Sequence, residues 1–133
     1  MSAFLDLQAG LLAYLRGQAS LAVWLGTPVR VYDQAPAEVV YPYVSFGRVS
    51  AQSIGGVEAD VTEQALNLIC VSRFGGSEEA KAIAAELRVL LDGAELDVAG
   101  LVSLRVTYID VFRSADQRTT YALVRLRAVT EAG

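Results

Sequence analysis

The last third of the sequence alternates between apolar and polar residues over two long stretches, residues 101–113 and 119–130. One face of the first stretch carries Val102, Leu104, Val106 and Tyr108, and one face of the second carries Ala122, Val124, Leu126 and Ala128. A period of two residues is typical of β-strands, and the short polar segment between them, residues 114–118, is typical of a turn. We therefore predict a long antiparallel hairpin whose apolar face has to be covered by another layer.

The opposite face of this hairpin is polar, with Arg105, Tyr121, Arg125 and Arg127 among its residues. After Tyr108 the phase changes, because the apolar residues Ile109 and Val111 fall on the polar face. This change predicts either a β-bulge or a patch that a neighbouring subunit buries. The arginines are open to two interpretations, a solvated or ion-paired sheet surface or a contact with carboxylates of the next copy. The candidate subunit interface comprises Arg105, Ile109, Val111, Tyr121, Arg125 and Arg127.

The rest of the chain supplies the covering layer. Helical spacing of apolar residues predicts helices over residues 3–16, 18–25 and 78–91, and we expect Trp24 to lie in the core. Strands are predicted at residues 29–32, 43–49 and 62–73, with a long loop over residues 50–61. The fold class is therefore α+β, an antiparallel or mixed sheet with a long C-terminal hairpin and helices packed on one face. We expect one domain, residues 1–133.

Side chains that carry out chemistry are scarce. The chain has no His and a single Cys, which excludes Ser-His-Asp and Cys-His nucleophile systems and any zinc site built on His or several thiolates. Cys70 lies in an apolar run, where a buried and unreactive thiol is expected. Gly75-Gly76 precedes a predicted helix, but the acidic Glu78 and Glu79 in its first turn argue against phosphate binding. We predict no catalytic, cofactor-binding or metal-binding residues.

Composition points to assembly. With 53% apolar residues and a mean hydropathy of +0.38, the 133-residue chain has more apolar surface than a monomer of this size readily hides, which favours a homo-oligomer. A net charge of −4 argues against phosphate neutralisation and against an anionic membrane surface. No apolar run is long enough to span a membrane, and no secretory signal is visible. We expect synthesis in the cytoplasm.

Several segments in the same order and spacing resemble the tail-terminator, or tail-completion, proteins of long-tailed phages and gene transfer agents. The resemblance covers nearly the whole chain, and no single segment is a specific motif. The segments are residues 11–25 (LLAYLRGQASLAVWL), 30–33 (RVYD) followed by Pro36, 41–44 (YPYV), 72–77 (SRFGGS) leading into Glu79-Ala80-Lys81, and the hairpin ending in Arg125-Leu126-Arg127-Ala128.

This resemblance implies a structural virion protein without enzymatic activity or cofactor. It implies a hexameric ring that caps the head-proximal end of the tail tube, ends tube polymerisation and joins the tail to the head-side connector. The implied partners are other copies of the chain, the tail tube protein and the connector or stopper protein, with DNA only passing through the lumen and with no membrane or small-molecule substrate. Assembly would place the protein in the tail neck of a phage or phage-like particle.

Two segments are candidates for contacts between rings, since mismatched loops and charges can stop further stacking. The first is residues 33–42, and the second is the tip of the predicted loop, comprising Ser53, Ile54, Gly55, Gly56, Val57 and Glu58. Other interpretations stay open at this point: a head-closure protein, a tube subunit, or, more remotely, a small-ligand binding module.

Overall fold

The computed structural model describes residues 3–55 and 60–131, and these build a five-stranded sheet in the order β1-β2-β3-β5-β4. The strands are β1 (Val31–Tyr32), β2 (Tyr43–Ser53), β3 (Val61–Ser72), β4 (Leu101–Arg113) and β5 (Thr120–Glu131). Only β1 and β2 pair in parallel, and every other neighbouring pair is antiparallel. The predicted C-terminal hairpin of β4 and β5 is present, and β4 forms one edge of the sheet while β1 forms the other.

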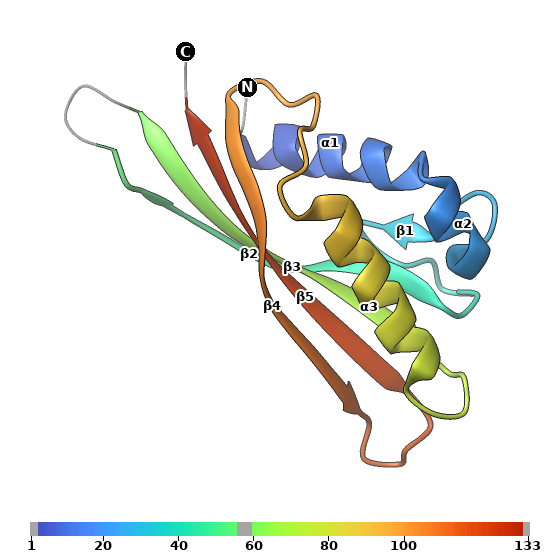
Figure 1. Cartoon of the computed structure of the whole chain (residues 1–133). Helices are drawn as coiled ribbons and strands as arrows, with labels where there is room; N and C mark the ends of the chain where they lie inside the picture. The colour runs from blue at the N-terminus through green and yellow to red at the C-terminus, as the bar shows by residue number, and fades with distance from the viewer. Residues whose placement is uncertain (1–2, 56–59, 132–133) are drawn as a thin grey trace.

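Three helices lie on one side of this sheet (Figure 1). They are α1 (Ala3–Arg16), α2 (Ala19–Leu25) and α3 (Glu78–Leu91). The predicted bounds of α1 and α3 are confirmed, and α2 starts one residue later because Gln18 is its N-cap. The predicted fold class, α+β with helices on one face of a mixed sheet, is therefore confirmed.

The core lies between the helices and the covered face of the sheet. Its apolar stripes follow the two periods in the sequence, about four residues in the helices and two in the strands. The largest fully buried apolar side chains are Leu7, Leu11 and Leu15 of α1, Leu21 and Leu25 of α2, Leu68 of β3, Ile83, Leu87 and Leu91 of α3, Leu104 of β4 and Leu126 of β5. Trp24 was predicted to lie in the core, but its side chain is 37% exposed. The buried stripe of α2 runs through Leu21 and Leu25, and Trp24 lies beside this stripe at the edge of the core.

A register shift in β4 decides which residues face the core. Pairing with β5 shifts between Val106 and Tyr108, so that Thr107 is the extra residue of a bulge. Beyond it, Ile109 and Val111 pair with the buried Val124 and Ala122 and therefore share the covered face. Of the two predicted alternatives, the bulge is present.

The same shift corrects the predicted faces of β4. Tyr108 lies opposite Arg125 on the uncovered face, although the alternation had grouped it with Leu104 and Val106. A second shift, between Leu101 and Ser103, leaves Val102 60% exposed, so that Val102 is not a core residue either. Simple alternation fails at both places because one unpaired residue exchanges the two faces of a strand.

The hairpin of β2 and β3 is longer than predicted. Strand β2 continues to Ser53, which pairs with Thr62, and the amide of Ile54 donates to the carbonyl of Val61. The predicted long loop over residues 50–61 is therefore wrong, and Ser53 belongs to a strand. A register shift between Phe46 and Val49 breaks the alternation of β2, which explains why periodicity ended the strand early. Gly56, Val57 and Glu58 lie outside the described residues.

Candidate functional site

The side of the sheet without helices is an open surface, here called the uncovered face. Its register places Arg125 beside Asn67 of β3 and Tyr108 of β4, and Arg127 beside Ala65 and Arg105. Arg105, Tyr121, Arg125 and Arg127 therefore share this face, as predicted from the alternation. Charged and aromatic side chains of three strands meet here, and folding leaves them available for contact with another molecule.

Local partners hold all three arginines, and on the sheet surface itself they are Glu63 and Asn67. The Nη2 atom of Arg127 lies 2.9 Å from Glu63 Oε2, and the Nε atom of Arg125 donates to Asn67 Oδ1 at 3.3 Å. The Arg125 guanidinium also lies 5.2 Å from the centre of the Tyr108 ring. These contacts orient the guanidinium groups, but the side chains of Arg127 and Glu63 keep 42% and 25% of their surface exposed. An exposed pair of this kind stabilises the fold only weakly and remains accessible to a partner.

The other end of the uncovered face is aromatic. Phe112 and Tyr121 stack with ring centres 5.4 Å apart, and Tyr41 and Tyr43 lie 5.6 Å apart. The guanidinium of Arg73 sits 4.6 Å from the Tyr41 ring centre. Burial and then the neighbouring Tyr41 raise the pKa of Tyr43 above its usual value. Of these residues, the sequence had placed only Tyr121 in the candidate interface. It missed the rest because they come from segments that meet only in the folded chain.

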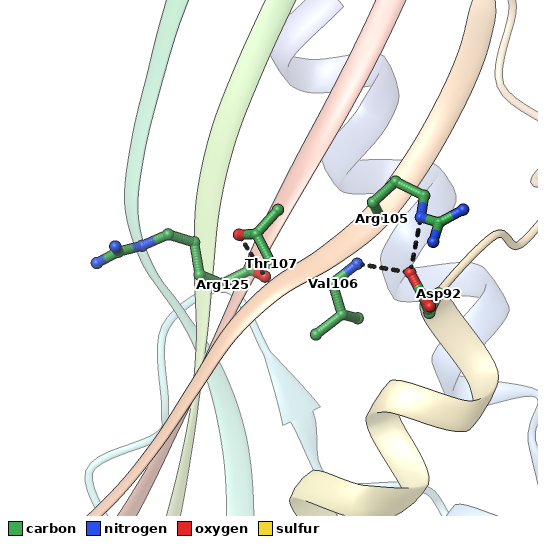
Figure 2. A network of polar contacts seen from close by, with 5 residues as sticks. All are labelled: Asp92, Arg105, Val106, Thr107 and Arg125. Atoms are coloured by element: carbon green, nitrogen blue, oxygen red, sulfur yellow. Dashed lines mark hydrogen bonds and ion pairs between the residues drawn. The ribbon is translucent and has the colours of Figure 1, made fainter.

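At the edge of the sheet, Asp92 joins the end of α3 to β4 (Figure 2). Its Oδ1 atom accepts a hydrogen bond from the Val106 amide at 3.0 Å and lies 3.0 Å from Arg105 Nε. The amide of Gly93 donates to the Leu104 carbonyl at 2.8 Å. The Leu104 carbonyl and the Val106 amide point outward from the edge strand β4, and both thus have hydrogen-bond partners. This protects this part of the edge from pairing with another strand.

A groove of about 620 Å³ opens between α3 and β4, and it is here called the α3–β4 groove. Its lining residues are Lys81, Ala84, Ala85, Arg88, Val89, Asp92, Ile109 and Val111. The bulge at Thr107 creates the floor, because it turns Ile109 and Val111 toward α3. Ile109 and Val111 therefore do not lie on the surface that carries the arginines. The predicted six-residue interface is divided between two surfaces, and its role in subunit contact stays a prediction.

Two observations on the described residues concern metal binding and thiol reactivity. No three His, Cys, Asp or Glu side chains in residues 3–55 and 60–131 are grouped so that they could hold a metal ion. Burial, and secondarily the charge of Glu79, raises the pKa of Cys70 to about 12, so that its thiol stays protonated at neutral pH. In the same part of the chain, no helix has the length and apolar character needed to cross a membrane.

The chain is similar to proteins of known structure and to a described protein family. A solved chain described as part of the virion of a native gene transfer agent particle is 27% identical and superposes with a TM-score of 0.86, with 95% of each chain covered. A second solved chain shares the fold at 19% identity and a TM-score of 0.56, covering 100% of this chain and 97% of its own. No curated protein sequence matches. Residues 9–131 match the family described as tail completion protein gp17, and the chain therefore belongs to this tail-completion family.

Proposed function

We propose that the chain forms a ring, hexameric in the assembled particle, that caps the head-proximal end of a phage-type tail tube. The ring ends tube polymerisation and joins the tail to the head-side connector, with DNA passing through its lumen. The observation that carries the proposal is family membership across residues 9–131, together with the likeness to a chain of a gene transfer agent virion.

Physical features of the fold support assembly. The two edges of the sheet are different, with β1 and residues 33–42 at one and β4 at the other. Contacts between unlike surfaces run head to tail, and they close into a ring when the rotation between copies allows it. Large apolar side chains also remain at the surface, among them Val23 at 80%, Val89 at 75% and Leu5 at 68% exposure. The high mean hydropathy of the chain thus fits a protein that buries such side chains between subunits.

Contact with the tube or the connector involves the tip of the β2–β3 hairpin. The described ends of this hairpin extend past the helices (Figure 1), and Ile54 at its end is 44% exposed. A described hairpin end that extends past the helices meets a neighbouring ring before the body of the subunit does. Its sequence then determines which ring is accepted and which is rejected.

Deletion of the gene tests the role directly, with tail length measured in electron micrographs of negatively stained particles. A terminator predicts overlong tails, and complementation with the intact gene restores their length. Tails of normal length beside empty heads would indicate a head-closure protein, and a complete loss of tubes would indicate a tube subunit. Normal tails on filled heads would refute a structural role in the neck. Ring stoichiometry follows from symmetry analysis of the neck by cryo-electron microscopy.

A further inference from the structure

We infer that the α3–β4 groove of one copy receives residues 33–42 of the next copy around the ring. These residues are here called the acidic segment. The inference rests on the proposed ring and specifies one contact within it, so it places residues 33–42 inside the ring and not between rings, where the sequence had made them a candidate. It assigns the groove to a second copy of this chain and not to the tube protein, the connector or a small molecule.

The groove has an apolar floor and a basic rim. Ala84, Ala85, Ile109 and Val111 contribute apolar surface, and Val89 beside them is 75% exposed. Lys81 and Arg88 are exposed at the rim and form no ion pair within the described part of the chain. The carboxylate of Asp92 already pairs with Arg105. The net charge presented to an occupant is therefore positive, and the occupant should be apolar and acidic.

The acidic segment has these properties and lies at the opposite edge of the sheet, between β1 and β2. Asp33 and Glu38 are exposed and form no ion pair with any residue in 3–55 or 60–131, and Val40 is 60% exposed. The Nε atom of Arg30 donates to the Pro42 carbonyl at 2.9 Å and so fixes the end of the segment. Its charges thus complement those of the groove, and it offers an apolar side chain to the floor.

The dimensions of the two partners are compatible. Helix α3 has 14 residues and is therefore about 21 Å long. The acidic segment contains no helix or strand, and a ten-residue segment can reach roughly 33 Å when extended. The two ends of the segment are anchored on the paired strands β1 and β2, so the segment doubles back as a loop. Such a loop can reach roughly half of its extended length, about 17 Å, which covers most of the groove.

Charge also favours this head-to-tail contact over a two-fold one. If two copies met groove to groove, Lys81 and Arg88 would face the same residues of the partner, and like charges would repel each other. When the groove of one copy meets the acidic segment of the next, that repulsion is absent. The pair of copies keeps one free groove at one end and one free acidic segment at the other. Such a contact repeats until the ring closes.

Cysteine crosslinking in purified particles tests the contact. The double variant V40C/V89C is treated with a short bismaleimide, and the products are separated on a denaturing gel. We expect a ladder of multimers of this chain, while V40C and V89C alone stay monomeric because native Cys70 is buried. A monomeric double variant in particles with tails of normal length would overturn the contact but leave the terminator role intact. A crosslink to a different protein would also overturn it.

A charge exchange provides a second, independent measurement. K81E and E38K should each lower ring association about tenfold, and the double variant K81E/E38K should recover most of it. The matched control is E95K, a reversal of an exposed acid outside both surfaces, which should leave association unchanged. Thermal unfolding followed by circular dichroism verifies that each variant folds. Additive losses in the double variant would overturn the contact. Overlong tails on deletion of the gene would still support the proposed function in that case.

Discussion

The contact between Asp92 and β4 allows a quantitative test of how the edge of the sheet is secured. Replacing Asp92 with Ala removes an acceptor for the Val106 amide and an ion pair with Arg105, both at 3.0 Å. A hydrogen bond to a charged group contributes about 1.5–3 kcal/mol, and partial exposure of this site favours the lower end. An exposed ion pair adds about 0.2–1 kcal/mol. We expect D92A to lower the free energy of unfolding by about 2 kcal/mol.

Two matched variants separate the contributions. D92N keeps an oxygen that accepts from Val106 but loses the ion pair, and R105A loses only the ion pair. Because the Arg105 side chain is 62% exposed, R105A should cost about 0.5 kcal/mol. D92N also replaces a charged acceptor with a neutral one and should cost about 1 kcal/mol. The midpoint of thermal unfolding should fall by about 8 °C for D92A, about 4 °C for D92N and about 2 °C for R105A, at about 4 °C per kcal/mol for a domain of this size.

Hydrogen exchange gives a local readout of the same contact. The Val106 amide should exchange slowly in the wild type and in R105A, and much faster in D92A, because only D92A removes its acceptor. Equal destabilisation by R105A and D92A would refute the reasoning, because the ion pair would then dominate. Unchanged stability in D92A would show that Asp92 does not secure this edge.

Three further predictions concern other parts of the molecule. Native Cys70 should resist alkylation at neutral pH. Burial raises the pKa of Cys70 from the 9.0 of an exposed thiol to about 12 in the folded protein. The stability that the buried thiol contributes should therefore be lost as pH rises from 9 to 12, and C70A should remove this loss in pH-dependent unfolding. G100A should lower the free energy of unfolding, measured in urea, by more than about 1 kcal/mol. Gly100 has a φ of +78°, and an added Cβ would collide with the Glu131 carbonyl oxygen. The control G75A, which has open space around the added Cβ, should cost much less. Charge reversal at Arg125 should weaken ring assembly, measured by light scattering, more than it lowers stability, measured by thermal unfolding. Equal losses of assembly and of stability would contradict a role of Arg125 in subunit contact.

Much of the fold could be predicted because its signals are local. The bounds of α1 and α3 and the existence of the long hairpin follow from periods of about four and two residues, which hydrophobic burial imposes on any chain. The absence of His and the single Cys could likewise be read without a structure. The family, too, was identified correctly, because the order and spacing of its segments are sequence properties.

The candidate surfaces depended on information that local patterns do not contain. The phase change after Tyr108 indicates a bulge or a buried patch, but it does not choose between them. The pairing of β4 with β5 places the bulge at Thr107 and turns Ile109 and Val111 into the floor of a groove. Likewise, Arg73 meets Tyr41 only after β2 and β3 align. The sequence alone determined the layers, the hairpin, the absence of His and the single Cys. Tertiary structure decided which side chains share a surface, because strand register is a property of two segments together and not of either one.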